Sequence, residues 1–182
     1  EDAEIVMFRA EICGEEHFAV LIGTGADSDT PLVRLHSQCI TGDILGSLKC
    51  DCGDQLQAAM RLMADTGGGV LVYLAQEGRD IGLLNKMRAY ALQDNGLDTV
   101  DANHALGFDT DERLFLPAVR ILQALNITKI QLITNNPDKI SQLEQHGINV
   151  MKRVPLAMAP NPHNQNYLQT KQARTGHIID KI

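Results

Sequence analysis

The chain has 182 residues, of which 44% are hydrophobic, so it is long enough to bury a substantial core in one domain. Its formal charge is −7 and only 4% of its residues are aromatic. Both values argue against a nucleic-acid partner, which needs a basic face and stacking aromatic side chains. No apolar run of about 18 residues and no signal-peptide pattern is visible, so we expect no membrane partner and a cytoplasmic location.

The first half of the chain predicts four strands and a helix. Apolar patterns indicate two strands over residues 4–12 and 17–23, joined by a turn, and a third over 32–37. Residues 53–67 have the apolar spacing of a helix with one buried face. A glycine run then leads into a buried strand over 70–75.

The middle of the chain predicts a loop, two helices and an irregular stretch between them. The loop covers 76–82 and leads into a helix that ends at Asp94, before an Asn-Gly pair. Residues 97–111 are expected to be irregular, and irregular stretches of this length inside a domain are often functional. A second helix is expected over 112–125.

The last third predicts a strand-helix-strand unit over 129–134, 135–147 and 148–156, with two parallel strands. Asn136 is suited to cap the helix. Thr134 then lies where a strand ends and a helix begins, a position where open α/β sheets bind anions and ligands. Beyond Pro155 the chain is polar and loosely patterned, and no repeat or linker is visible, so one domain is the simplest interpretation.

Cys39, Cys50 and Cys52 lie close together in the sequence, beside a predicted helix N-terminus that favours thiolates. Thiolates favour zinc, and three protein ligands leave a fourth position where a water can be activated. The spacing is also compatible with free cysteines that serve as small hydrophobic residues. A closed structural site remains a third alternative, with a fourth ligand from Cys13, His36 or His104.

Basic residues in several motifs could converge on an anionic ligand, Lys86 among them. Asp111 and Arg113 stand two residues apart where a helix is expected to start. An arginine held by an acid is a common way to aim a cation at a phosphate, although a carboxylate there can also serve the helix dipole.

Four segments in this order resemble GTP cyclohydrolase II of riboflavin synthesis: 34–56 with the cysteines, 76–108 with QEGRDIG, 111–115 and 134–140. The resemblance runs from about Arg34 to Pro155 and continues weakly to His177. It implies a three-layer α/β/α fold around a mixed sheet, a homodimer, and a single domain over residues 1–182. Because family members are often fused to a dihydroxybutanone phosphate synthase, the chain is also expected to be compatible with the C-terminal part of a longer protein.

By resemblance, the family opens the imidazole ring of GTP and releases formate and pyrophosphate. The product is 2,5-diamino-6-(5-phosphoribosylamino)pyrimidin-4-one. Zinc would be held by Cys39, Cys50 and Cys52, and magnesium would neutralise the triphosphate. Asp111 would be the general acid/base, Arg113 the nucleophile at the α-phosphate, and Tyr90 would take part in ring opening. The residues implied to contact GTP are Arg34, Leu35, His36, Ser37, Gln38, Gln55, Glu77, Gly78, Arg79, Thr99, Thr134 and Lys139.

Two features leave alternatives to that reaction. The family usually has Glu where this chain has Gln38, so a role for that carboxylate is in question. A guanidinium has a pKa above about 12, so an electrostatic role for Arg113 rivals a nucleophilic one. The alternatives are an enzyme that opens the ring but retains the triphosphate, and a zinc-stabilised nucleotide-binding protein without catalysis.

Overall fold

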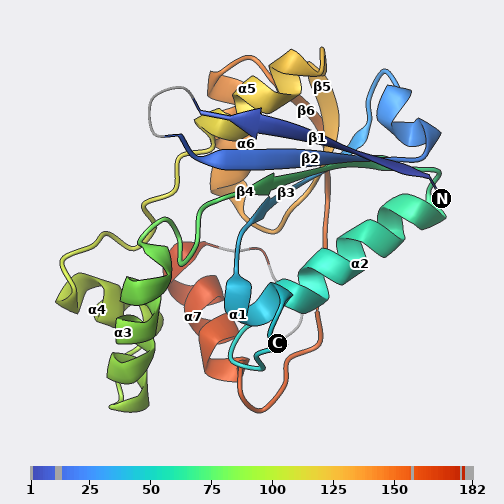
Figure 1. The fold of residues 1–182 in the computed structure, drawn as a ribbon. Helices are drawn as coiled ribbons and strands as arrows, with labels where there is room; N and C mark the ends of the chain where they lie inside the picture. The colour runs from blue at the N-terminus through green and yellow to red at the C-terminus, as the bar shows by residue number, and fades with distance from the viewer. Residues whose placement is uncertain (1, 11–13, 157, 177, 179–182) are drawn as a thin grey trace. The chain divides into compact units, whose positions relative to one another are not determined.

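The computed structural model describes residues 2–10, 14–156, 158–176 and 178 (Figure 1). Its contacts divide the chain into two compact units. The first, here the sheet unit, comprises Glu1–His36, Leu56–Ala75 and Leu114–Leu156. The second, here the helical unit, comprises Ser37–Gln55, Gln76–Arg113 and Ala157–Ile182. The single domain expected from the sequence stays a prediction.

The sheet unit is built on a six-stranded mixed sheet with the order β1-β2-β4-β3-β5-β6. The pairs β1/β2 and β2/β4 are antiparallel, whereas β3/β5 and β5/β6 are parallel. This confirms the expected α/β class with N-terminal hairpin strands. The strands are β1 (Ala3–Arg9), β2 (Glu16–Ile22), β3 (Leu32–Ser37), β4 (Gly69–Leu74), β5 (Lys129–Ile133) and β6 (Asn149–Val154).

The core of the sheet unit lies where β3, β4 and β5 meet the helix α5 (Leu116–Ala124). β4 is buried on both faces except at Tyr73, as its uninterrupted apolar sequence predicts. Leu35, Phe115, Leu122 and Leu132 are all fully buried in this cluster. The packed core fixes the carboxyl ends of β3 and β5, where several of the candidate site residues lie.

The C-terminal strand-helix-strand unit is confirmed. β5 is followed by α6 (Pro137–Gln145) and by β6, which pairs with β5 in parallel. The side chain of Asn136 accepts a hydrogen bond of 3.0 Å from the backbone N–H of Asp138, which is the predicted N-cap. The capping hydrogen bond that the sequence predicts is therefore present at the start of α6.

The helical unit contains two helices where the sequence predicted irregular chain. In the stretch 97–111, α4 (Thr99–Ala105) forms because the Asp98 carboxylate accepts bonds from the N–H groups of Val100 and Asp101. Beyond Pro155, α7 (Gln165–Thr175) forms although its sequence is largely polar. The helical unit also contains α1 (Ile40–Asp43) and α3 (Gly82–Asp94). The helix α2 (Cys52–Asp65) starts in the helical unit, and its later residues belong to the sheet unit. The sheet unit also has a short 3₁₀ helix, Thr24–Asp27.

One helix boundary also differs from its prediction. The helix expected from residue 112 is α5, and it begins only at Leu116. Phe115 is its N-cap, and Pro117 lies in its first turn, where a missing N–H costs nothing. The residues just before the cap are not helical, so Asp111 and Arg113 lie outside the helix.

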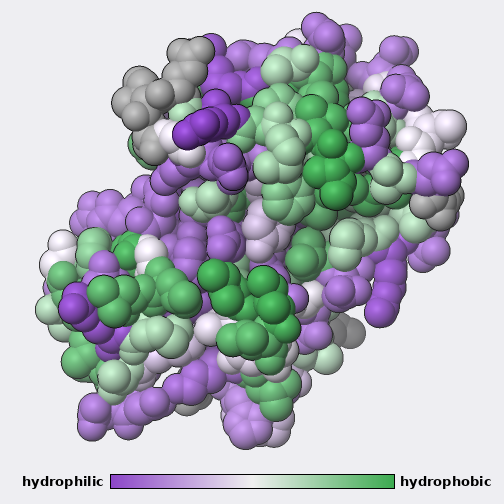
Figure 2. Space-filling model, viewed as in Figure 1, coloured by the Kyte–Doolittle hydropathy of each residue, from purple (hydrophilic) through white to green (hydrophobic). Residues whose placement is uncertain are grey.

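Hydrophobic side chains also appear at the surface. Figure 2 shows them over α1 and the loop that follows it, where Ile44, Leu45 and Leu48 are all more than half exposed. Among the described residues, no helix is both long and apolar enough to cross a bilayer.

Candidate metal centre and catalytic site

The three cysteines meet within the helical unit. Cys39 is the N-cap of α1, Cys50 precedes α2, and Cys52 is the first residue of α2. Their sulfur atoms all lie within 4.8 Å of one another, and Sγ of Cys39 is 3.7 Å from Sγ of Cys50. None of the three forms a disulfide bond among the described residues. The predicted cluster is therefore brought together with the spacing and the soft donors that suit one zinc ion.

Gly42 explains how three sulfurs fit into so small a space. A Cβ atom at this position would lie 2.9 Å from Sγ of Cys50 and 3.2 Å from Sγ of Cys39. Only glycine leaves the α1 backbone close to both sulfurs without a collision. The α1 backbone at Gly42 therefore lies directly against the sulfur atoms of Cys39 and Cys50. Cys13, one of the fourth ligands considered above, lies outside the described residues.

Hydrogen bonds within the cluster favour a thiolate at Cys39. Bonds from Cys50 and Cys52 hold the pKa of the Cys39 thiol far below its usual value. The same bond with Cys39 raises the pKa of Cys50. The Cys39 sulfur therefore carries the negative charge that a bound cation would meet in this cluster.

Lys86 lies beside this cluster, and its position could not be anticipated from sequence spacing. Its Nζ atom donates to Sγ of Cys39 at 3.1 Å, to Oγ1 of Thr41 at 2.9 Å and to Oε1 of Glu77 at 2.8 Å. Both Lys86 and Glu77 are 8% exposed. Burial alone would lower the pKa of Lys86, but its bond to Glu77 raises that pKa above the usual value, so Lys86 is a fixed cation.

Glu77 connects this lysine to the backbone around the first cysteine. Its Oε2 atom accepts from the N–H of Ile40 at 2.7 Å, and its Oε1 atom accepts from the N–H of Gly78 at 2.9 Å. The Glu77 carboxylate therefore accepts three hydrogen bonds, from Lys86, Ile40 and Gly78. Glu77 was expected to contact GTP, and that role stays a prediction.

Tyr90 lies one turn after Lys86 on α3 and is half buried. Burial raises the pKa of its hydroxyl above the usual value, so the group stays neutral and can donate a proton or a hydrogen bond. Two ammonium groups lie over its ring: Nζ of Lys49 is 5.1 Å and Nζ of Lys86 is 5.7 Å from the centroid. The structure therefore places Tyr90 next to the lysine that contacts Cys39.

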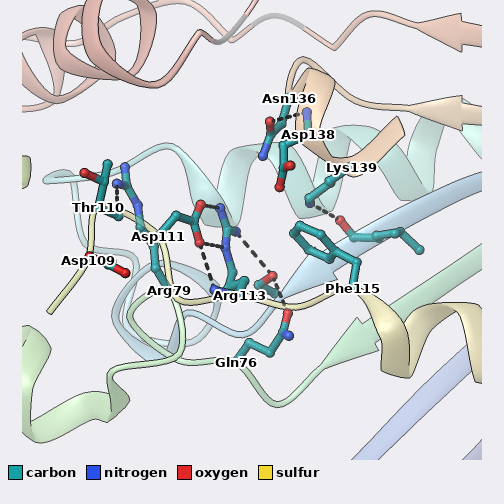
Figure 3. Close-up of polar contacts among 12 residues, drawn as sticks. Gln76, Arg79, Asp109, Thr110, Asp111, Arg113, Phe115, Asn136, Asp138 and Lys139 are labelled. Atoms are coloured by element: carbon teal, nitrogen blue, oxygen red, sulfur yellow. Dashed lines mark hydrogen bonds and ion pairs between the residues drawn. The ribbon is translucent and has the colours of Figure 1, made fainter. Parts of the chain in front are cut away.

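Asp111 and Arg113 form a two-pronged ion pair, shown in Figure 3. Nη2 of Arg113 donates to Oδ2 of Asp111 at 2.5 Å and Nε donates to Oδ1 at 2.8 Å. Burial would raise the pKa of Asp111, but the bonds from Arg113 lower it overall, so the carboxylate is ionised. Nη1 of Arg113 also donates to Oγ of Ser37 at 3.3 Å, and that hydroxyl donates to Oε1 of Gln76 at 3.1 Å.

The loop 76–82 is tied to the segment that carries this pair. Nη1 of Arg79 donates to the carbonyl oxygen of Thr110 at 2.9 Å (Figure 3). Arg79 and Asp80 both have left-handed backbones, with φ of 62° and 75°. Non-glycine residues in this region carry strain that neighbouring contacts must offset, and such strain is concentrated at functional sites. The loop that carries Glu77, Gly78 and Arg79 is therefore held in one conformation by its contacts.

Within the sheet unit, another group of predicted residues lies at the carboxyl ends of the parallel strands β3 and β5. Nη1 of Arg34 donates to the carbonyl of Ile133 at 3.1 Å, and Nζ of Lys139 donates to the carbonyl of Leu35 at 2.7 Å. Nζ of Lys139 is also 5.1 Å from the ring centroid of Phe115 (Figure 3). This group has five predicted members, which are Arg34, Leu35, His36, Thr134 and Lys139.

Three further predicted residues belong to the helical unit. Gln38 is half buried beside Cys39, and Nε2 of Gln55 donates to Oδ2 of Asp51 at 2.5 Å. Thr99, the first residue of α4, lines a cavity of about 600 Å³. Lys49, His163, Tyr167 and Arg174 also line that cavity.

The sequence pattern of the family described as GTP cyclohydrolase II matches residues 1–155. The chain belongs to the GTP cyclohydrolase II family. It is 52% identical over 179 residues to a GTP cyclohydrolase-2 of Azospirillum brasilense, covering 98% of this chain and 46% of that protein. It is 54% identical to a GTP cyclohydrolase-2 of Azotobacter vinelandii, covering 96% of this chain and 84% of the relative.

A third relative, the GTP cyclohydrolase-2 of Salmonella typhimurium, is 49% identical over 180 residues, which covers 99% of this chain and 92% of that protein. The chain thus spans about half the length of the Azospirillum relative and most of the other two. The resemblance stated above is therefore confirmed at the level of the family.

Proposed function

We propose that this chain hydrolyses GTP, opening its imidazole ring with release of formate and pyrophosphate in an early step of riboflavin synthesis. The product is the 2,5-diamino-6-(5-phosphoribosylamino)pyrimidin-4-one named above. The observation that carries the proposal is the convergence of three thiols within 4.8 Å in a chain of the GTP cyclohydrolase II family.

Zinc held by Cys39, Cys50 and Cys52 would supply Lewis acidity and an activated water for attack on the carbon between the two imidazole nitrogens. The three thiols, which form no disulfide bond among the described residues, and the space left by Gly42 fit this ion. Tyr90, neutral at pH 7, is suited to donate a proton to a ring nitrogen as the ring opens. Asp111 is ionised and is suited to accept a proton.

For Arg113, the contacts favour an electrostatic role at the α-phosphate. Two of its nitrogens are engaged by Asp111, and although burial opposes its charge, the Asp111 bond raises the pKa of the guanidinium above its usual value. A guanidinium that holds its proton so firmly is a poor nucleophile and a good anion clamp. A fixed cation of this kind stabilises the charge that develops as the phosphoanhydride breaks.

We further propose that GTP is contacted by the residues named next, with a magnesium ion on its phosphates. The proposed residues of the helical unit are Ser37, Gln38, Gln55, Glu77, Gly78, Arg79 and Thr99. Those of the sheet unit are Arg34, Leu35, His36, Thr134 and Lys139. A homodimer in the cytoplasm is part of the same proposal, and sedimentation analysis of the purified chain tests the dimer.

Formate and pyrophosphate must be measured together to test the reaction. The protein is incubated with GTP, zinc and magnesium, and both products are followed in the same sample. Equal molar release of the two supports the proposal. Formate without pyrophosphate would identify the alternative that retains the triphosphate. GTP binding with neither product would identify a nucleotide-binding protein and contradict the proposed reaction.

A further inference from the structure

We propose that Lys86 is a positioning residue of the metal centre that sets how strongly the Cys39 sulfur donates to the metal. The inference rests on the proposed zinc site and adds a residue to which the resemblance assigned no role. Its basis is the 3.1 Å contact from Nζ of Lys86 to Sγ of Cys39.

The geometry of Lys86 leaves its ammonium little freedom. An ammonium has three N–H donors, and the structure gives it three acceptors, on Cys39, Thr41 and Glu77, at 2.8–3.1 Å. Because the side chain is 10% exposed, water can offer little competition for these bonds. The donor that faces the sulfur is therefore held in place.

The surroundings of Lys86 are built to keep it charged. Removing an ammonium from water is costly unless an anion is close, and the Glu77 carboxylate is 2.8 Å away. Gly78 has φ of 64°, and a Cβ there would lie 3.0 Å from Cβ of Lys86, so glycine lets the loop pass close to the lysine stem. A lysine needed only to fill space would not require this arrangement.

Charge explains what the contact would do. Three thiolates around a divalent zinc ion give the centre a net charge of −1. A charged N–H donor on one sulfur withdraws electron density from it, so that sulfur donates less to the metal. The metal then keeps more of its positive charge and is the stronger Lewis acid. Lys86 would thus keep the metal a stronger Lewis acid than three thiolates alone would leave it.

Cobalt(II) in place of zinc provides a readout that does not depend on activity. Its sulfur-to-cobalt charge-transfer band reports how tightly the thiolate holds its electrons. In Lys86→Met, which keeps the apolar stem but has no donor, we expect this band to shift to longer wavelength. Lys86→Arg keeps a charged donor and should shift less. Arg88→Met, on the exposed face of the same helix, should leave the band where the parent has it.

Formate release on the zinc protein gives a second readout. Residues that support metal ligands typically change affinity or activity by about 10–100-fold when mutated. We therefore expect Lys86→Met to lower kcat for formate release by about 10-fold or more, with little change in KM for GTP. A role in anchoring the fold would instead lower stability and leave the band of correctly folded protein unmoved.

The outcomes separate this inference from the proposed function. If the parent binds no cobalt or zinc, the proposed metal centre fails and the inference falls with it. If the parent binds cobalt but folded Lys86→Met has the parent's band and kcat, only the inference is overturned. It is also overturned if folded Lys86→Met cannot bind cobalt, because Lys86 would then build the site instead of tuning it. Should Lys86→Met not fold, Lys86→Gln decides, because its side chain is polar but carries no charge: a band and a kcat both equal to those of the parent overturn the inference.

Discussion

Two side-chain nitrogens of Arg113 donate to the carboxylate oxygens of Asp111, at 2.5 and 2.8 Å. The backbone N–H of the same arginine donates to Oδ1 at 3.2 Å. Both side chains lie mostly out of solvent, with 13% and 29% exposure. The pair is therefore a partly buried salt bridge, in which each charge offsets the cost of removing the other from water. Its two members carry the roles proposed for proton transfer and for the α-phosphate.

Arg113→Ala should eliminate pyrophosphate release, with a loss of roughly 10³-fold or more if the guanidinium acts as an arginine clamp. Arg113→Lys distinguishes a clamp from a nucleophile, because lysine keeps the charge but loses the planar fork. Partial recovery of pyrophosphate release in Arg113→Lys supports the clamp, and no recovery supports a role specific to the guanidinium. Release at the parent rate in Arg113→Ala would contradict both. Product analysis by ion-exchange chromatography measures the effect.

The Asp111 carboxyl should titrate below its ordinary pKa of about 3.8–3.9. Because the pKa is lowered in the folded state, the pair contributes stability that is fully present above about 3.9 and is lost as the pH falls through the lowered value. Arg113→Gln should move the Asp111 pKa upward, since burial then acts with less opposition. NMR of the carboxyl carbon measures the shift, and an unchanged pKa in Arg113→Gln would show that Arg113 does not stabilise the anion.

Gly42→Ala should weaken zinc binding while the sheet unit stays folded. The added Cβ would lie 2.9 Å from Sγ of Cys50 and 3.0 Å from Cβ of Cys52, so the sulfurs must move apart. Gly46→Ala is a control from the loop that follows α1: its φ of 65° makes alanine strained there, but no atom lies within 4 Å of the added Cβ. Zinc affinity by chelator competition measures both variants. Equal affinity of Gly42→Ala and parent would mean that the cluster tolerates a wider spacing.

How much of this could be predicted from the sequence depended on the distance over which each signal acts. The three cysteines span 14 residues, and the helix that begins beside Cys52 has a clear apolar period, so their convergence was predictable. Asn136 and its helix were predictable for the same reason. Lys86 lies 47 residues from Cys39, and only the packing of α3 shows that the two meet.

The missed helices have a physical explanation as well. In α4 the cap is Asp98, but the short helix offers only a few buried positions, so no apolar period is visible. In α7 the stabilising contacts are long-range: Arg174 pairs with Asp98 at 2.6 Å and with Asp101 at 2.9 Å. Neither partner can be found by reading the helix alone.

Gln38→Glu should raise the activity or shift its pH profile if the carboxylate usual in the family helps to orient a water or the base. Glu adds a charge and loses the amide donors that Gln38 has. The pH dependence of kcat/KM for formate release measures the effect. An unchanged rate and profile would show that the Gln38 side chain has no part in the reaction.

Cys50→Ser tests the central claim, that a metal held by three thiolates opens the GTP ring. The sulfur of Cys50 is 3.7 Å from that of Cys39, and a serine hydroxyl is a much poorer zinc ligand than a thiolate. The measurement is zinc content together with formate release, on protein whose fold is checked by circular dichroism. We expect a folded protein that has lost zinc and releases no formate. Formate release at the parent rate from a zinc-free Cys50→Ser protein would show that no metal held by these thiolates opens the ring.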